Sequence, residues 1–390
     1  MQIIRTKIVI FRTDRVGEVL LASSVIDCVK TAYPQADITF VTSEYARDII
    51  DGRDDVSEVL TVDTFEKKAW FLKAIRLARI LHEKHFDLAI VLNPHKILHL
   101  ASFLAGIPLR AGYNRKWGFL LNAAIPDERD SGEKHEIEYN MDLLRKLNIE
   151  TFARPPRLVL NKTAEKYVEE LFARKGVDTK KVLITIHPGS SNTAKMWPKE
   201  NYAEVTKRLK KEVECSIAII GTAREKALAD KIVMDSGGAA LNFSGLFDLK
   251  QLAACLEKAS VFIGNDTGPM HMAAALKVPV IALFGRKIQG VSPTRWRPWG
   301  HGHTVFHKDA GCSVCKDTKC ELNYKCMLAI TVEEVVRAAK ETLKRKKETA
   351  LFPPLKKETA LFPPLKKETA LFPPLKKETA LFPPLKKETA

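Results

Sequence analysis

The chain has 390 residues, of which 45% are hydrophobic and 28% charged, which excludes wholesale disorder and a fibrous protein and suggests about two domains. No apolar run approaches the roughly 18–20 residues that span a bilayer. The apolar run within residues 1–15 is too short and too interrupted by charge for a signal peptide, so we expect no export signal. With seven cysteines, we then expect a reducing cytoplasm rather than a disulfide scaffold. The excess of 63 Lys and Arg over 47 Asp and Glu gives +16, which favours an anionic partner such as nucleic acid, anionic lipid or a phosphorylated sugar.

Short β-branched runs alternate with amphipathic helical patterns, which indicates parallel sheets with crossover helices. In the first half we predict strands at 7–11, 38–41, 59–62 and 88–92, and helices at 19–33 and 70–82. The pattern then restarts, with predicted strands at 182–186, 216–220, 261–263 and 280–284, and helices at 201–213, 225–234, 249–258 and 331–344.

Two such α/β units, joined near residues 151–163, predict two Rossmann-like domains that face a cleft. We place the first domain at 1–160 and the second at 161–345. Ligands of these sheets bind at the carboxyl ends of the strands, and the unusual residues of the chain cluster there. A cleft-binding enzyme is therefore the leading class.

Residues 346–390 repeat the decapeptide KKETALFPPL and hold ten Lys and five Glu, so residues 1–345 still carry +11. The Pro-Pro pairs break any helix at every repeat. We expect a low-complexity, disordered tail with short helical stretches around KKETALF. It either has no measurable role or adsorbs weakly to anionic lipid.

The loop after the first strand reads RTDRVGEVL. A dinucleotide-binding fold would need G-x-G-x-x-G there, and the single Gly17 removes the main support for an NAD-dependent dehydrogenase. Glu18 then stands at the start of a helix, towards the cleft. It is either a carboxylate that complements the helix dipole or a general base, with Asp14 as the next candidate.

A second loop, HPGSSNTAKMWP, follows the strand predicted at 182–186. Hydroxyls of Ser190 and Ser191 and free backbone N–H groups can bind phosphate oxygens, and Lys195 adds a positive charge. The alternative is a polar loop with a solvated lysine.

A third loop, GNDTGPMH, lies between the strand at 261–263 and an alanine-rich helix. Thr267 and Gly268 leave backbone donors open at the positive end of that helix. Asp266 either contacts sugar hydroxyls or caps the helix. His271 on its own would be a structural histidine.

Together, the blocks RTDRVGEVLLASSVI, IHPGSSNTAKMWPKENYAEV and FIGNDTGPMHMAAALKVPVIALFG resemble the bacterial ADP-heptose:lipopolysaccharide heptosyltransferases, in order and spacing, over about residues 5–340. The resemblance implies the GT-B architecture of glycosyltransferase family 9, with the donor nucleotide in the C-terminal half and the acceptor in the N-terminal half. It implies an inverting transfer of heptose from ADP-heptose to the Kdo/heptose inner core of lipopolysaccharide. It implies no cofactor and no metal, and a cytoplasmic enzyme that is peripheral on the inner membrane.

The resemblance also assigns roles to single residues. The matched diphosphate contacts are Ser190, Ser191, Lys195, Thr267, Gly268 and His271. Asp266 matches the aspartate that contacts the sugar, and Glu225 matches the acidic residue that holds the ribose. Gly17-Glu18-Val19 matches the family's Gly-Asp-Val, whose Asp is the proposed base; Glu is longer by one methylene. Glu18, Lys195 and Asp266 are thus the implied catalytic residues.

The implied acceptor, a Kdo-bearing lipid A core, is anionic and membrane-anchored, which suits the basic body of the chain. Candidate acceptor contacts are Arg12, Arg15, His95, Lys96, Arg110, Arg115 and Lys116, although solvated surface charge is the simpler interpretation of any one of them. A related transferase that moves another nucleotide-activated sugar to a similar glycan is the alternative, because diphosphate motifs do not specify the sugar. Nucleic-acid binding is suggested only by the pI of about 9.4 and lacks a recognition motif, so no nucleic acid is expected.

Four cysteines form a group that looks like the cysteine-rich segment of many family members: Cys312, Cys315, Cys320 and Cys326. They could bind zinc in a reducing compartment, with His301, His303 and His307 as alternative ligands, or they could stay reduced thiols or form adventitious disulfides. Their spacings are unusual for a zinc knuckle, so no metal is assigned.

Overall fold

The computed structural model describes residues 6–66, 68–152, 154–178 and 180–351, with side chains up to residue 346. Within these ranges the chain up to Glu348 forms one compact unit. The tail predicted to be disordered lies outside the described residues from position 352 onward. No helix in the described ranges is both long and apolar enough to cross a membrane.

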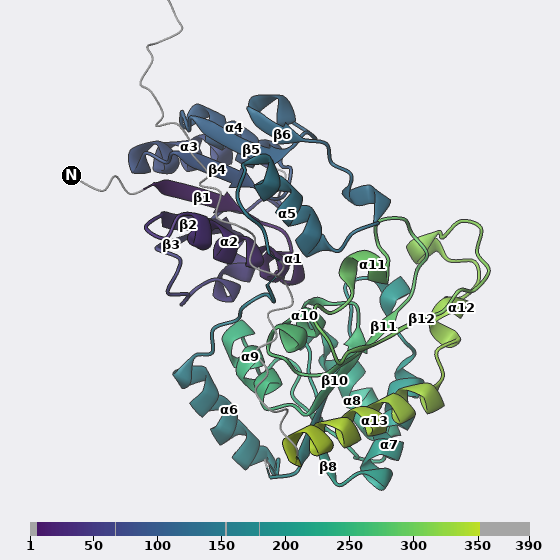
Figure 1. Ribbon diagram of the computed structural model, residues 1–390. Coiled ribbons are helices and arrows are strands. Elements are labelled where there is room, and N and C mark those ends of the chain that lie inside the picture. Colours follow the sequence, from purple (N-terminus) through teal and green to yellow (C-terminus); the bar gives the residue numbers. More distant parts are fainter. Residues whose placement is uncertain (1–5, 67, 153, 179, 352–390) are drawn as a thin grey trace, which may run out of the picture. The chain divides into compact units, whose positions relative to one another are not determined.

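The N-terminal lobe, from β1 to α5, is built on a six-stranded parallel sheet of order β3-β2-β1-β4-β5-β6 (Figure 1). Its strands are β1 Lys7–Phe11, β2 Asp37–Thr42, β3 Glu58–Thr61, β4 Leu88–Val91, β5 Leu109–Tyr113 and β6 Ala123–Ile125. Its helices are α1 Val16–Ala22, α2 Ser24–Ala32, α3 Trp70–Lys84, α4 Lys96–Leu104 and α5 Glu136–Lys146, with short 3-10 turns η1 Glu44–Ile49, η2 Gly118–Leu120 and η3 Arg129–Ser131.

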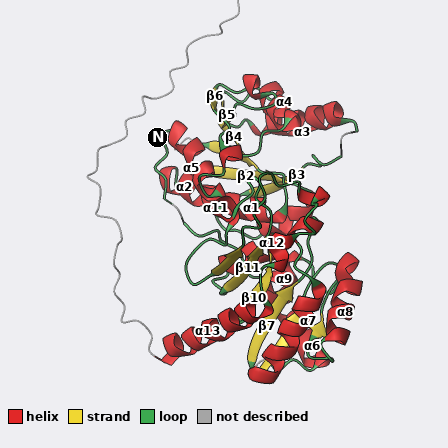
Figure 2. Cartoon of the chain, turned by 90° about the vertical axis from the view of Figure 1, so that its right-hand side faces the viewer, coloured by secondary structure: helices red, strands yellow, loops and turns green. Residues whose placement is uncertain are grey.

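The C-terminal lobe, from α6 to α13, repeats the plan with order β12-β11-β10-β7-β8-β9, and Figure 2 shows its strands flanked by helices. Its strands are β7 Val182–His187, β8 Cys215–Ile219, β9 Leu241–Asn242, β10 Val261–Asn265, β11 Val280–Phe284 and β12 Thr304–His307. Its helices are α6 Lys162–Lys175, α7 Lys199–Glu212, α8 Lys226–Asp235, α9 Leu249–Glu257, α10 Gly268–Ala275, α11 Pro293–Trp296, α12 Lys325–Leu328 and α13 Val332–Leu351, with 3-10 turns η4 Thr193–Lys195, η5 Ala223–Glu225 and η6 Asp317–Lys319.

The predicted α/β class with two Rossmann-like sheets is confirmed, and three details differ. The helix expected at 19–33 is two helices, because the hydroxyls of Ser23 and Ser24 donate to the carbonyls of Leu20 and Leu21 at the break and so compete with the regular helix ladder. Several elements were not predicted: α4, β5, β6 and α5 between residues 96 and 146, and α6, β9 and β12 in the C-terminal lobe, where the strands are short. The last helix runs on to Leu351, into the first repeat. The domain limits at 160 and 345 stay predictions.

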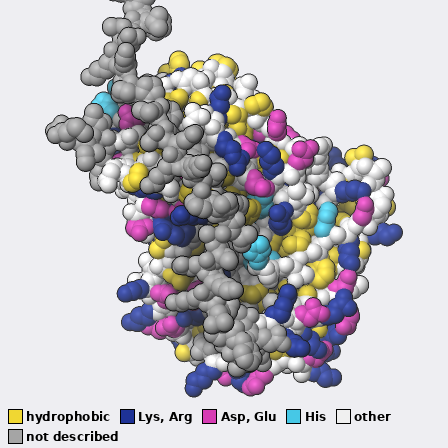
Figure 3. Space-filling model, in the orientation of Figure 1, with side chains coloured by type: hydrophobic (Ala, Val, Ile, Leu, Met, Phe, Trp, Pro, Cys, Tyr) yellow, Lys and Arg dark blue, Asp and Glu magenta, His cyan; other side chains and the backbone are white. Residues whose placement is uncertain are grey.

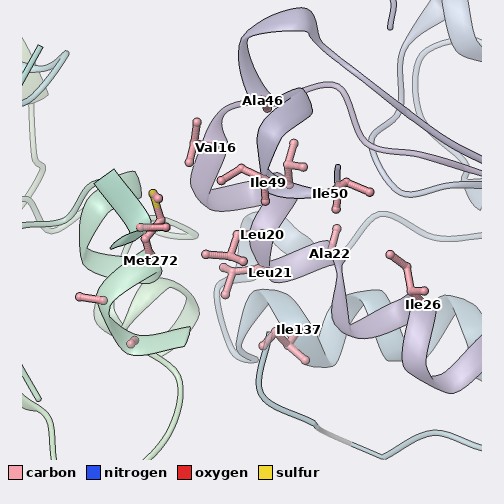
Figure 4. Packing of buried hydrophobic residues seen from close by; sticks show 14 of the residues in the cluster. Val16, Leu20, Leu21, Ala22, Ile26, Ala46, Ile49, Ile50, Ile137 and Met272 are labelled. Atoms are coloured by element: carbon pink, nitrogen blue, oxygen red, sulfur yellow. The ribbon is translucent and has the colours of Figure 1, made fainter. Parts of the chain in front are cut away.

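The two lobes share one cluster of buried apolar side chains that passes through α1 and α10. In Figure 4, Leu20 and Leu21 lie on the side of α1 that faces Met272 of α10. A Cβ at Gly17 would lie 2.9 Å from the His271 ring, and one at Gly268 would lie 3.3 Å from Val16. A side chain at Gly17 would therefore collide with the His271 ring, and one at Gly268 would fit only tightly against Val16, so the two helix starts approach closely.

Candidate active site

A cavity of about 250 Å³ opens beside the first turn of α1, at the carboxyl ends of β1 and β4. Glu18 lines this cavity, as the first strand and its loop predict. The other lining residues, mostly charged, are Arg12, Asp14, Asn93, Pro94, Arg115, Lys116, Arg129, Asp130, Arg295 and Trp296. The last two come from α11 of the C-terminal lobe, so residues from both lobes form the cavity.

Glu18 and Asp14, the two candidate bases, differ in their partners. Asp14 pairs with Arg12 at 3.1 Å and accepts a hydrogen bond of 2.7 Å from the Asn93 side-chain amide. No side chain among the described residues donates a hydrogen bond to Glu18. Burial raises the pKa of Glu18, although Arg12 partly opposes this. A carboxylate with a raised pKa and no fixed donor is a better proton acceptor than one held in an ion pair.

Behind the cavity, the fully buried carboxylate of Glu136 joins three arginines. Its Oε1 accepts from Arg12 at 2.9 Å, and its Oε2 accepts from Nε of Arg295 at 2.8 Å. Arg129 Nη1 lies 3.8 Å away. Burial by itself raises the pKa of Glu136, but Arg12, Arg295 and Arg129 lower it overall. Since Arg295 belongs to α11 and Glu136 to α5, this ion network also links the two lobes.

In the C-terminal lobe, His187 at the end of β7 connects two of the predicted donor loops. Its Nδ1 lies 3.1 Å from Oγ1 of Thr267, and its Nε2 lies 3.6 Å from the Glu225 carboxylate. Glu225 also accepts hydrogen bonds from the backbone N–H and hydroxyl of Thr222 at 2.7 and 2.9 Å. Partial burial raises the pKa of Glu225, but His187 and Thr222 lower it to about 2. A side chain at Gly189 would collide with this carboxylate.

Lys195 and Asp266, predicted from separate loops, form an ion pair in the structure. Nζ of Lys195 donates to Oδ2 of Asp266 at 2.5 Å and to its carbonyl oxygen at 3.2 Å. Asp266 is buried and Lys195 is half-buried. The solvated-lysine alternative is therefore wrong, and the pair places an ammonium beside the start of α10.

Buried Asn265, at the end of β10, links the start of the GNDTGPMH loop to the HPGSSNTAKMWP loop after β7. Its side-chain amide donates to the carbonyl of Pro188 at 2.8 Å, and its oxygen accepts from Trp197 and Tyr202. In the loop so anchored, Ser190 accepts a hydrogen bond from the backbone N–H of Asn192, while Ser191 is exposed. The serine hydroxyls are thus near the surface, next to the buried polar anchor.

The start of α10 carries the remaining predicted donor residues. Thr267 is its N-cap residue, and Gly268 begins the helix, with Pro269 in the first turn. Burial lowers the pKa of His271 to about 4, so its ring is neutral near pH 7. Its Nδ1 is buried and finds no hydrogen-bond partner among the described residues. The backbone N–H groups and the positive dipole end at the start of α10 suit an anionic group.

The basic residues predicted to contact an acceptor are divided by the structure. Arg12, Arg115 and Lys116 line the cavity, but Arg12 is already paired, and Arg115 pairs with Asp127 and Asp130. The others do not line it: Arg15 is exposed, His95 caps α4, Lys96 lies over Trp70, and Arg110 donates to carbonyls of its own lobe.

The four cysteines at 312–326 are free, half-buried thiols that line a second cavity. Within the part of the chain that the structure describes, no group of three or more His, Cys, Asp or Glu side chains is placed to hold a metal ion.

Several residues that form or support the site were not predicted from the sequence: His187, Asn265, Arg129, Glu136, Arg295 and Trp296. His187 and Asn265 end strands inside motifs that were recognised, so their position was a usable signal. Glu136 and Arg295 are far from every motif, and only the fold brings them to the cavity.

Comparisons with known proteins agree with this fold. The family described as glycosyltransferase family 9 (heptosyltransferase) matches residues 74–325. Lipopolysaccharide heptosyltransferase 2 of Escherichia coli K12 is 24% identical over 345 residues, covering 85% of this chain and 96% of the relative. The structure of E. coli ADP-heptose LPS heptosyltransferase II superimposes with a TM-score of 0.73 at 22% identity, covering 88% of this chain and 100% of the other. A family 9 glycosyltransferase from Veillonella parvula gives 0.77 at 22% identity, covering 88% and 99%.

Two doubly wound parallel sheets with a charged cavity formed by residues from both lobes are the architecture of GT-B proteins. Because the family match covers more than half of the chain, the protein belongs to glycosyltransferase family 9, as its motifs indicated.

Proposed function

We propose that the protein is an inverting glycosyltransferase that moves heptose from ADP-heptose to the Kdo/heptose inner core of lipopolysaccharide. The observation that carries this proposal is the contact of α1 with α10 at Gly17 and His271. It brings a carboxylate with a raised pKa, Glu18, close to a helix start that suits a diphosphate. The names of the E. coli relatives supply the sugar and the acceptor class.

In the proposed reaction, Glu18 accepts the proton of the acceptor hydroxyl while the oxygen attacks the anomeric carbon. The bond from that carbon to the diphosphate breaks on the opposite face, which inverts the centre and releases ADP. Lys195 and the N–H groups at the start of α10 stabilise the charge that develops on the diphosphate. Protonated Glu18 then returns its proton to water.

The remaining donor contacts follow from the same arrangement. Ser190 and Ser191 bind diphosphate oxygens, together with Thr267, Gly268 and His271. Asp266 contacts sugar hydroxyls while it orients Lys195. Glu225, which its low pKa keeps ionised, accepts hydrogen bonds from the ribose hydroxyls.

For the acceptor, the cavity supplies both positive charge and the base. Lys116 and Arg115 at its edge suit the carboxylates of a Kdo-bearing lipid A core. Such an acceptor is membrane-anchored, so we place the enzyme in the cytoplasm, peripheral on the inner membrane.

A thermal-shift panel with ADP, UDP, GDP and NAD tests the donor site. A ligand that binds only the folded protein raises its stability with the logarithm of ligand concentration, so ADP alone should raise the unfolding midpoint. A larger shift with UDP or GDP would contradict the donor assignment. Transfer assays with ADP-heptose and other ADP-sugars then distinguish heptose from the alternative of another activated sugar.

Lys195→Ala should weaken ADP binding and lower kcat/KM by about 10²–10³-fold, because it removes a charge that stabilises the departing diphosphate. Steady-state kinetics and ADP titration measure both effects. Lys199→Ala, an exposed lysine four residues on, is the matched control and should behave as wild type. Near-normal turnover in Lys195→Ala, with an unchanged unfolding midpoint, would remove Lys195 from the donor site.

A further inference from the structure

Aromatic side chains gather on the surface of the N-terminal lobe where α3 begins and η2 packs against α4. Trp70 makes edge-on contacts with Phe71 and Trp117, whose ring centroids lie 5.7 and 5.5 Å away, and Trp117 contacts Phe119 at 5.9 Å. Phe71 is 50% exposed and Phe119 is 74% exposed. We call Trp70, Phe71, Leu72, Trp117 and Phe119 the aromatic patch.

A contiguous exposed patch of this kind is unusual on the solvent-facing surface of a protein and indicates a binding partner. Hydrophobic side chains are also visible along the upper edge of the view in Figure 3, near the end of the lobe where Figure 1 labels α4 and β6. Three more exposed apolar residues lie on the same helices or on the loop before α3: Phe65, Phe103 and Leu104.

Positive charge surrounds the aromatic patch. Nζ of Lys96 lies 3.8 Å above the ring of Trp70, and Lys68, Arg76 and Lys116 are exposed on the segments that carry the patch. The neighbouring carboxylates, Asp63 and Glu66, are both paired with Lys73. The patch therefore presents aromatic rings together with a surplus of cations.

The aromatic patch adjoins the acceptor cavity. Lys116, which lines the cavity, directly precedes Trp117, and Pro94 of the cavity wall lies two residues before Lys96. A molecule that is anchored in a partner bound at the aromatic patch can therefore reach the cavity lined by Glu18.

We propose that the aromatic patch docks on the surface of an anionic lipid bilayer and holds the cavity against it, an inference that rests on the proposed lipid-linked acceptor. Trp rings favour the interface between headgroups and acyl chains, and lysines beside them are attracted to anionic headgroups. The ammonium of Lys96 lies over the Trp70 ring in a cation–π contact, which keeps a positive charge within the aromatic patch.

Trp fluorescence of the full chain tests this, with vesicles of phosphatidylglycerol and phosphatidylcholine that carry brominated acyl chains as quenchers. The repeats contain no Trp, so quenching reports the folded part even if the tail also adsorbs. Anionic vesicles should quench the emission, and pure phosphatidylcholine vesicles should do so much less. Trp70→Phe with Trp117→Phe should abolish most of the quenching.

Phe71→Ser with Phe119→Ser should lower vesicle partition of the patch by about tenfold or more, since two apolar side chains leave the interface. Met234→Ser with Leu328→Ser, two exposed apolar residues of the C-terminal lobe, is the matched control and should bind as wild type. Transfer to a soluble, deacylated acceptor should not change in either variant, and transfer to acceptor in vesicles should fall only in the first.

Unchanged quenching in the Phe71/Phe119 variant would overturn the inference. So would an equal loss with the soluble acceptor, which would indicate a saccharide-stacking surface instead, or equal binding to neutral vesicles. If the quenching results are as expected but neither wild type nor any variant glycosylates an acceptor, the proposed function is wrong and the docking surface is still supported.

Discussion

Glu18→Gln should lower kcat by about 10²–10⁴-fold, the usual contribution of a positioned base, while ADP-sugar binding survives. The amide keeps the shape of the side chain in the cavity but cannot accept the proton of the acceptor hydroxyl. Single-turnover transfer, with ADP-sugar affinity measured separately, distinguishes loss of the base from loss of the site.

Two further variants sharpen this result. Glu18→Asp restores the residue usual in the family and should retain far more activity than Glu18→Gln. Glu44→Gln, which changes an exposed carboxylate in the first turn of η1, is the control and should be unaffected. If Glu18→Gln matched wild type in kcat, the carboxylate would only complement the dipole of α1, and Asp14 would be tested next as the base.

The pH profile follows from the raised pKa of Glu18. The base works only when it is ionised, so kcat/KM should fall as pH drops through that pKa and level off above it. Because burial displaces the pKa upward, the decline should begin at a higher pH than for an exposed glutamate. A profile that stays flat down to the pH range of exposed glutamates would argue against Glu18 as the base.

Glu136→Ala should lower the free energy of unfolding by about 3–5 kcal/mol, the usual cost of removing one partner from a buried ion network. It leaves the buried guanidinium of Arg12 with only one of its two carboxylate partners, Asp14, and detaches Arg295 from α5. Denaturant unfolding at neutral pH measures the loss. Asp142→Ala, which removes surface pairs with Lys134 and Arg145, is the control and should cost at most about 1 kcal/mol.

The sign of the pH dependence separates this network from simple packing. The pKa of Glu136 is lower in the folded protein than its ordinary value, so its stabilisation is present above the unfolded pKa of about 4.3. That stabilisation disappears as pH falls through the folded pKa. The stability difference between wild type and Glu136→Ala should therefore shrink at acid pH, and a constant difference would mean that only packing was lost.

Local patterns predicted most of the individual strands and the loops that follow them. Each of these features can be recognised from a few residues: the buried run at 7–11, the HPGSS turn and the GNDTGPMH turn. This is possible because the apolar pattern of a strand and the residue types at a helix start are local properties. Glu18, Lys195 and Asp266 could be selected in this way, each from its own loop.

Which of these residues meet was decided only by the tertiary structure. The close approach of Gly17 to His271, the pairing of Lys195 with Asp266, and the network of Glu136 with arginines from both lobes join residues separated by tens to hundreds of positions. No periodicity or spacing encodes such contacts, because they depend on how two sheets pack through α1 and α10. The sequence by itself therefore determined the fold class, the family and the chemistry of each loop, while the packing of the two lobes determined the site.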